Sequence, residues 1–390
     1  MKNQTSPSFV LVPDSFKGTM SSTEICAIMS RQILARYPRA NITSIPVADG
    51  GEGSVDCFLQ AVGGHKQTMI VKNPFFEDMT GFFGLLSDGC TAVVEMAACA
   101  GLPLVEERKN VLKATTYGVG QLLCQAAQTP GITRIIVGLG GSATHDGGCG
   151  AACAAGGIFQ DDQGEAFIPT GESLHRIAHI DTTGLNPALK DKTIITMCDI
   201  DNPMLGPQGA AAVFGPQKGA APDIVNILDN GTQNLAAVIE KDLGLTVAEL
   251  PGSGAAGAMG AGMVAFFGSR LQMGIEAVLD VVGFEQAAQA ADMILTGEGR
   301  IDSQSLRGKV VLGVARRAGP LGVPVVAVVG DIGTADDEGC DLSAAYDQGV
   351  TGIFSINRVA VDFPNIRWRA GADLAATVDN ILRFWQAIRS

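Results

Sequence analysis

Short apolar runs alternate with longer segments of helical spacing along most of the chain. The first run, residues 9–12, ends at Asp14 and predicts a buried strand that leads into a polar loop. Ser21 and Glu24 have the spacing of a capping box, and apolar positions then recur at helical intervals as far as Pro38. Strand, loop and helix in this order predict a βα unit, which is typical of sheets with parallel strands.

Further apolar runs predict strands in most other parts of the chain. The runs at residues 69–71, 81–86 and 92–96 are joined by short turns, which favour antiparallel pairing. Residues 222–243 carry apolar side chains on one stripe and predict a long helix. Additional strands are predicted at residues 42–47, 133–138, 193–198, 293–296, 323–329 and 352–356, and a last helix at about 372–388.

These patterns predict an α/β protein with two domains. A doubly wound, Rossmann-like domain is expected from both chain ends, residues 1–72 and 290–390, because both ends show plain strand–helix alternation. Residues 73–289 are expected to form an inserted domain of mixed α/β structure. We expect the active site in the cleft between the two domains.

The composition excludes several classes of partner. Apolar residues make up 46% and charged residues 17% of the chain, which is typical of a globular protein. The formal net charge of −13 leaves no basic surface for nucleic acid or for an anionic membrane. No apolar window reaches the roughly 18 residues of a membrane helix, and the N-terminus lacks an apolar targeting segment. The nine cysteines form no CxxC pair, so a cytoplasmic protein is expected. The sequence leaves its oligomeric state open between a monomer and a homo-oligomer.

Carboxylates follow several of the predicted strands. Asp14, Asp49, Asp146, Asp199 and Glu298 each lie just beyond an apolar run, at the carboxyl edge where open α/β sheets bind ligands. Any one of them alone also fits a turn or a helix cap. Their recurrence favours one common ligand-binding cleft.

Glycine-rich loops are the second feature with candidate chemistry. Gly140, Gly141 and Ser142 follow a predicted strand, and Ser253 and Gly254 lie in a similar loop. Exposed backbone N–H groups in such loops favour a phosphate or carboxylate, although tight packing against a neighbouring backbone also selects glycine. Both loops match a GxGxxG or GxGxxA pattern, so a nicotinamide-dependent hydroxy-acid oxidoreductase is a rival function.

Lysines near these loops could meet phosphate groups. A Walker A loop is absent, because Gly308-Lys309 is followed by Val310 and lacks the earlier glycine. By sequence position, Lys17 and Lys309 are the cations best placed to bind phosphate. Each of them also fits a solvated surface charge.

Several ordered motifs recur from residue 9 onward. They are Asp14-Ser15-Phe16-Lys17 and residues 47–53, 140–148, 198–203, 214–219 and 296–302. In this order, the motifs resemble those of the bacterial glycerate kinases of the type I family. The resemblance implies an ATP-dependent kinase that phosphorylates a hydroxyl of D-glycerate in glyoxylate and sugar-acid catabolism, with 2-phosphoglycerate as the favoured product. A sugar-acid binding protein without catalysis is a further alternative.

Phosphoryl transfer requires positioning and charge neutralisation, and the motifs supply residues for both. Lys17, Asp49 and Asp199 are the candidate catalytic residues, with Asp199 or Asp49 orienting the acceptor hydroxyl. Glu298 and Asp302 are the candidate ligands of Mg²⁺. The candidates for binding the phosphates of ATP are Gly140, Gly141, Ser142, Ser253, Gly254 and Lys309, and those for binding D-glycerate are Ser15, Arg300, Lys218 and Asn202.

Overall fold

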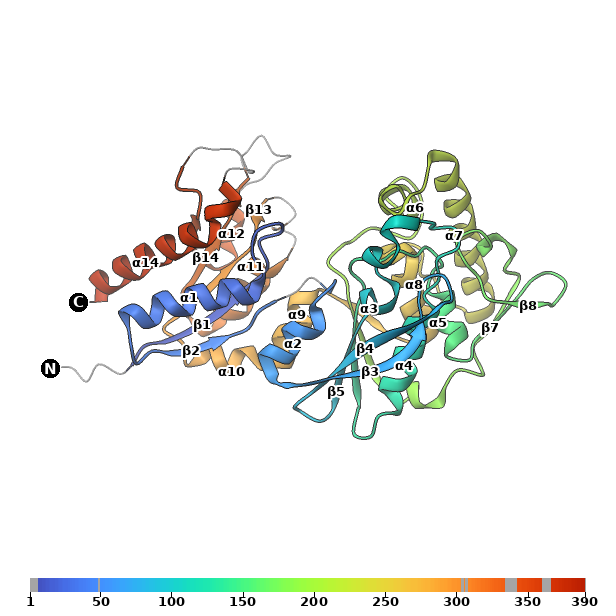
Figure 1. Cartoon of the computed structure of the whole chain (residues 1–390), viewed down its shortest axis with the longest axis horizontal. Helices are drawn as coiled ribbons and strands as arrows, with labels where there is room; N and C mark the ends of the chain where they lie inside the picture. Colours follow the sequence, from blue (N-terminus) through green and yellow to red (C-terminus); the bar gives the residue numbers. More distant parts are fainter. Residues whose placement is uncertain are drawn as a thin grey trace. The chain divides into compact units, whose positions relative to one another are not determined.

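A computed structural model describes residues 6–47, 50–302, 305, 308–333, 342–359 and 366–389. The chain divides into two compact units (Figure 1), a first unit of residues 1–48 with 275–390 and a second unit of residues 49–274. Both chain ends therefore belong to one α/β unit, but the boundaries differ from those expected at residues 72/73 and 289/290. At the first boundary, β3 (Gly64–Lys72) pairs along its length with β4 (Asp78–Leu86), so it belongs to the sheet of the second unit. At the second boundary, residues 275–289 belong to the first unit.

The first unit contains a five-stranded sheet in the order β16-β14-β12-β1-β2, with every pair parallel. This is the flavodoxin-like form of the predicted doubly wound sheet. The winding direction reverses between β1 and β12, so the loops after these strands flank the switch point, where such sheets bind ligands. The strands are β1 (Ser8–Pro13), β2 (Asn41–Ser44), β12 (Met293–Gly297), β14 (Val325–Val329) and β16 (Val350–Ser355).

Helices cover the sheet of the first unit. The helices α1 (Ser22–Arg36) and α14 (Ala370–Arg389) lie side by side in Figure 1 and pack on the face that includes Phe9 and Leu11. The predicted capping box begins α1, because Ser21 and Glu24 exchange side-chain to backbone hydrogen bonds. The other helices are α9 (Gly274–Val282), α10 (Phe284–Gln289), α11 (Val310–Ala318) and α12 (Ser343–Asp347), and the short strands β13 (Arg300–Ile301) and β15 (Asp331–Ile332) pair separately.

The second unit contains a six-stranded mixed sheet in the order β11-β10-β6-β5-β4-β3. The predicted antiparallel pairs are present, since β4 pairs in this way with both β3 and β5, while the remaining pairs are parallel. A small sheet has the order β8-β7-β9. The bounds are β5 (Thr91–Glu95), β6 (Arg134–Gly138), β7 (Ile158–Gln160), β8 (Ala166–Phe167), β9 (His179–Asp181), β10 (Thr193–Met197) and β11 (Arg270–Gln272).

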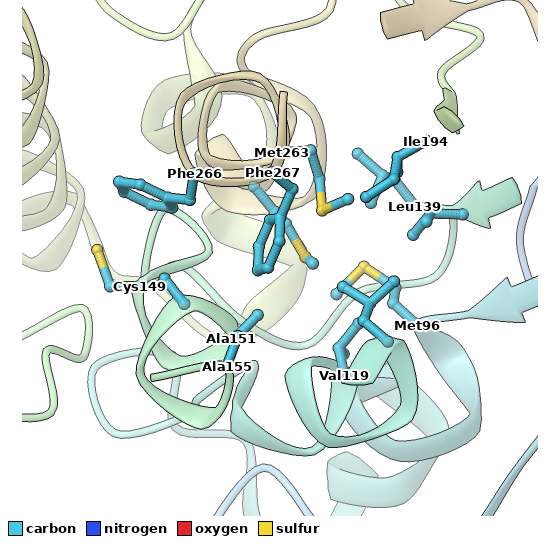
Figure 2. Packing of buried hydrophobic residues seen from close by; sticks show 14 of the residues in the cluster. Met96, Val119, Leu139, Cys149, Ala151, Ala155, Ile194, Met263, Phe266 and Phe267 are labelled. Carbon is cyan, nitrogen blue, oxygen red and sulfur yellow. The ribbon is translucent and has the colours of Figure 1, made fainter. Parts of the chain in front are cut away.

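A large apolar core holds the second unit together (Figure 2). Small side chains at Ala151 and Ala155 leave room for Phe266 and Phe267 of a neighbouring helix. The predicted long helix is present as α7 (Pro222–Leu243). The remaining helices are α2 (Ser54–Val62), α3 (Ala97–Ala100), α4 (Tyr117–Gln128), α5 (Cys149–Ala154), α6 (Ala210–Phe214) and α8 (Ala255–Phe267). Within the described residues, no helix is both long and apolar enough to cross a membrane.

Candidate functional site

Loops at the carboxyl ends of β1, β12 and β14 meet in the first unit. The N–H of Asp14 donates to Gly297 O at 2.9 Å, and the N–H of Gly330 donates to Glu298 O at 3.1 Å. A Cβ placed on Gly299 would lie 3.4 Å from Lys17 N, so these loops are in close contact. The structure therefore brings Lys17 and Glu298 to the switch point of the sheet.

Glu298 is the buried carboxyl group of this cluster. Glu298 as a residue is only 6% exposed, and its Oε1 has no hydrogen-bond partner in the described part of the chain. Burial raises the pKa of Glu298 to about 8; Ser305 and Lys309 lower it, and Asp14 and Asp302 raise it further. The group is therefore largely protonated at neutral pH, and a bound cation would favour its ionised form.

This cluster fits the predicted magnesium site only if water and phosphate oxygens supply most of the ligands of the ion. Among the described residues, no group of three or more His, Cys, Asp or Glu side chains is arranged to hold a metal ion. Mg²⁺ commonly takes one or two protein carboxylates and completes its shell with water and phosphate oxygens. The unpartnered oxygen of Glu298, with Asp302 close enough to influence its pKa, is compatible with that mode of binding.

The other predicted residues of the first unit lie on the loops after β1 and β12 and at the start of α11. Lys17 lies exposed on the turn after the half-buried Ser15. Lys309 is half-buried and precedes the first residue of α11. Asp302 Oδ1 accepts a 3.2 Å hydrogen bond from Ser305 N. Arg300 Nη1 lies 3.9 Å from Asp331 Oδ2, and both of these side chains are about half exposed.

In the second unit, the first glycine-rich loop packs against another loop. A Cβ on Gly138 would lie 2.3 Å from Gly50 O, and one on Gly140 would lie 2.5 Å from Gly51 Cα. The N–H of Gly140 already donates to Gly50 O at 2.9 Å. Close backbone packing thus explains glycine at these positions, and the Gly140 N–H that was expected to bind phosphate donates to an internal acceptor.

Buried Lys218 lies under the same loop. Its Nζ donates to Ser142 Oγ and to Thr144 O, each at 2.7 Å. Lys218 is only 2% exposed and forms no ion pair with any carboxylate that the structure describes. Burial lowers the pKa of Lys218 to about 7, and the charge of Asp146 opposes this shift. The sequence assigned Ser142 to phosphate and Lys218 to substrate, and the structure joins these two side chains by a direct hydrogen bond.

The residues after Ser142 form a buried polar cluster. Asp146 accepts hydrogen bonds from Thr116 N at 2.7 Å and from Thr116 Oγ1 at 2.9 Å, so it anchors this loop to α4. His145 Nε2 lies 2.9 Å from Thr232 Oγ1. Burial, and secondarily the charge of Lys218, lower the pKa of His145 to about 3, so the imidazole is neutral. Thr144 Oγ1 and His145 Nδ1 are buried without a partner among the described residues.

The sequence did not single out Thr144. Its only sequence signal is its place in the motif of residues 140–148, where the glycines and the aspartate are more conspicuous.

The second glycine-rich loop holds the loop after β10 in place. The N–H of Gly254 donates to Asn202 O at 3.0 Å, and a Cβ on Gly254 would lie 2.1 Å from Pro203 O. Ser253 is fully buried, with its hydroxyl donating to Ala248 O at 3.0 Å and its N–H to Leu250 O at 2.9 Å. These internal hydrogen bonds occupy the N–H groups of Ser253 and Gly254 and the hydroxyl proton of Ser253, which were expected to bind phosphate.

The catalytic candidates of the second unit differ in what the structure shows. Asp199 Oδ1 accepts a 2.7 Å hydrogen bond from the N–H of Gly274, the first residue of α9. It therefore caps a helix, which is the alternative that the sequence left open. Asn202 Nδ2 donates to Gln208 O at 2.8 Å, so it supports its own loop. Asp49 lies outside the described residues.

The geometry also removes support for the dinucleotide pattern in the first glycine-rich loop. In a dinucleotide fingerprint, the glycine-rich turn opens directly into a helix whose N-terminus binds the pyrophosphate. Here the next helix after Gly138 and Gly140 is α5, which begins only at Cys149 and spans 6 residues. The first unit thus holds a cluster of acids and lysines at the switch point of its sheet, and the second unit holds a buried ammonium. Each of these features is compatible with an α/β enzyme that acts on anionic small molecules.

Comparisons with known proteins agree with this class. The model of the glycerate kinase family matches residues 9–386. Glycerate kinase of Bacillus subtilis is 42% identical over 348 residues, covering 89% of each chain, and glycerate 2-kinase of Escherichia coli is 41% identical over 348 residues, covering 89% of this chain and 90% of the other.

A solved structure from Salmonella typhimurium LT2, described as glycerate kinase 2, is also similar. It superposes with a TM-score of 0.85 at 36% identity and covers 99% of this chain and 100% of its own. The chain belongs to the glycerate kinase family. Neither the oxidoreductase nor the binding protein without catalysis is supported by these comparisons.

Proposed function

We propose that this protein is an ATP-dependent glycerate kinase of the cytoplasm, which transfers the γ-phosphoryl group of ATP to D-glycerate and forms 2-phosphoglycerate. The observation that carries the proposal is the family match over residues 9–386, which includes both the acid and lysine cluster and the Lys218 site. Phosphoryl transfer depends mainly on positioning and on neutralising charge, and these residues are suited to both tasks.

Residues of the first unit are assigned to the nucleotide. Lys17 and Lys309 neutralise phosphate charge, and Glu298 and Asp302 hold Mg²⁺. Bound Mg²⁺ would supply positive charge to offset the negative charge of the phosphate groups during transfer. Exposed Lys17 has the reach to follow the transferred phosphoryl group, because its ammonium is a flexible point charge.

The acceptor hydroxyl needs a group that orients it and takes its proton. In the reaction, the hydroxyl oxygen of D-glycerate forms a bond to the γ-phosphorus as the bond to ADP breaks. We assign the proton to Asp199, with Asp49 as the competing candidate. Ser15, Arg300 and Asn202 stay candidates for contacts with the rest of D-glycerate.

A coupled assay of ADP release tests the proposal. The protein should consume ATP with D-glycerate and release little ADP with L-glycerate, glycolate, lactate or no acceptor. Equal ADP release with and without D-glycerate would reject it. So would a change in nicotinamide absorbance with a hydroxy acid in the absence of ATP.

A further inference from the structure

We propose that Ser142, Thr144 and Lys218 form the subsite for the carboxylate of the acceptor. The inference rests on the proposed function, since it names the part of D-glycerate that one group of residues binds. It also moves Ser142 from the nucleotide to the acceptor.

The burial of Lys218 is the first argument for an anion. An ammonium removed from water is costly unless an opposite charge and further hydrogen bonds compensate for it. The two oxygens that accept from Lys218 Nζ are neutral, a hydroxyl and a backbone carbonyl. An ammonium has three donor protons, and no described residue accepts the third. A bound anion would supply both the missing charge and the missing acceptor.

The loop above Lys218 supplies further donors. Ser142 Oγ accepts from Lys218, so the Ser142 hydroxyl proton is available to donate elsewhere. The N–H groups of Gly141 and Ser142 have no acceptor among the described residues, and Gly141 is exposed. Two backbone hydrogen bonds hold the loop, from Leu102 N to Gly141 O at 2.7 Å and from Ala143 N to Ala100 O at 2.9 Å. These donors are therefore preorganised.

A buried polar atom without a partner is the independent second observation. Thr144 is fully buried, and its Oγ1 has no hydrogen-bond partner among the described residues, while its backbone oxygen accepts from Lys218. Buried hydroxyl groups are nearly always hydrogen-bonded in native proteins. A ligand that adds acceptor oxygens beside Lys218 would account for this exception.

Charge decides between a carboxylate and the triphosphate of the nucleotide. Asp146 is the acid whose charge raises the pKa of Lys218. Both of its carboxylate oxygens already accept hydrogen bonds, from donors such as Thr116 N and Gly148 N. His145 beside it is neutral. The subsite thus provides the single positive charge of the Lys218 ammonium and no free carboxylate oxygen for a metal ion, which matches a carboxylate of charge −1. The cluster around Glu298 combines acids with Lys309 and suits a metal-bound polyphosphate better.

The test separates acceptor binding from nucleotide binding with matched variants. Lys218→Met removes the charge and keeps an unbranched side chain in the buried site, Ser142→Ala removes one donor, and Lys309→Met is the control. Calorimetry measures Kd for D-glycerate with a non-hydrolysable ATP analogue present, and Kd for MgATP alone. Steady-state rates compare D-glycerate with its neutral amide, D-glyceramide.

Lys218→Met should weaken D-glycerate binding by about 100-fold or more, because a buried charge partner is lost, while MgATP affinity changes by less than about threefold. Its preference for D-glycerate over D-glyceramide should fall by a similar factor. Ser142→Ala should weaken D-glycerate by about tenfold, the effect of one hydrogen bond to a charged group. Lys309→Met should show the reverse pattern and weaken MgATP.

Loss of MgATP affinity in Lys218→Met with unchanged D-glycerate affinity would overturn the proposal in favour of a phosphate site. Unchanged discrimination against D-glyceramide would overturn it as well. If Lys218→Met does not fold, the smaller Ser142→Ala change decides by the same criteria. A wild-type protein that consumes no ATP with D-glycerate would instead reject the proposed function, so the two failures are distinct.

Discussion

The carboxylate of Asp199 caps α9 by accepting a 2.7 Å hydrogen bond from the N–H of Gly274. A helix cap and a catalytic base place different demands on this residue. A cap needs an acceptor oxygen, which asparagine also has, whereas a base needs an ionisable group. Substitutions at Asp199 can therefore separate the two roles.

Asp199→Asn should keep the cap and lose the base. We expect a melting temperature close to that of the wild type, unchanged MgATP affinity by calorimetry, and kcat lower by about 10²–10⁴. Asp199→Ala should in addition lose about 1 kcal/mol of unfolding free energy, because the cap is removed. Normal turnover of Asp199→Asn would leave Asp199 with the structural role alone and move the base to Asp49.

Lys17 should act in the reaction and not in folding. It is exposed on a turn, so Lys17→Ala should unfold at nearly the wild-type denaturant concentration. If its ammonium contacts the phosphoryl group mainly in the transition state, Lys17→Ala should lower kcat and leave KM for ATP almost unchanged. A folded Lys17→Ala protein with wild-type kcat/KM would remove Lys17 from the site.

The raised pKa of Glu298, about 8, makes stability depend on pH. A buried acid with a raised pKa favours folding in its neutral form, so its contribution is complete below the unfolded value near 4.5 and is lost as pH rises through 8. The Glu298→Gln side chain cannot ionise, so the variant does not lose this stability as pH rises. The melting temperature of Glu298→Gln relative to wild type should therefore rise between about pH 6 and about pH 9.

A control variant isolates this effect. Glu249 lies exposed on a turn, and Glu249→Gln should differ from the wild type by the same amount at both pH values. A constant difference for Glu298→Gln as well would mean that the Glu298 carboxyl is not held in its neutral form.

The start of α8 contains backbone strain that can be measured. Ala256 has φ 54° and ψ 41°, in the left-handed region that disfavours side chains with a Cβ. Ala256→Gly should raise the unfolding free energy by about 1 kcal/mol. Ala265 lies further along the same helix, where Ala→Gly should lower stability by about 1 kcal/mol. Chemical denaturation measures both, and the same sign for both variants would contradict the strain at Ala256.

The elements were predicted best where periodicity and end signals coincide. The bounds of α7 agree with the prediction because the helix carries a long apolar stripe, and because a proline marks its first residue and Gly244 follows its last. For β3 the prediction covered only residues 69–71, since residues such as His65 and Lys66 are exposed on this edge strand and give no apolar run. The boundary expected after residue 72 separates β3 from β4, although the run at 69–71 was itself predicted to pair with residues 81–86.

The site was predicted less completely because its contacts are distant in sequence or contrary to ordinary preferences. Ser142 and Lys218 are 76 residues apart, and lysine is rarely buried without a charged partner, so no sequence pattern indicated their hydrogen bond. Glycine motifs are ambiguous for a different reason. The same residue type permits anion binding and close packing, and only the position of Pro203 O against Gly254 showed which applies there.

The most direct test of the central claim is the ³¹P spectrum of the product formed from ATP, Mg²⁺ and D-glycerate. The account predicts one new phosphate monoester in equal amount to the ADP formed, with its resonance split into a doublet by the single hydrogen on C2. A triplet, from phosphate on the C3 methylene group, would contradict 2-phosphoglycerate as the product. Release of inorganic phosphate without any new ester would contradict glycerate kinase activity itself.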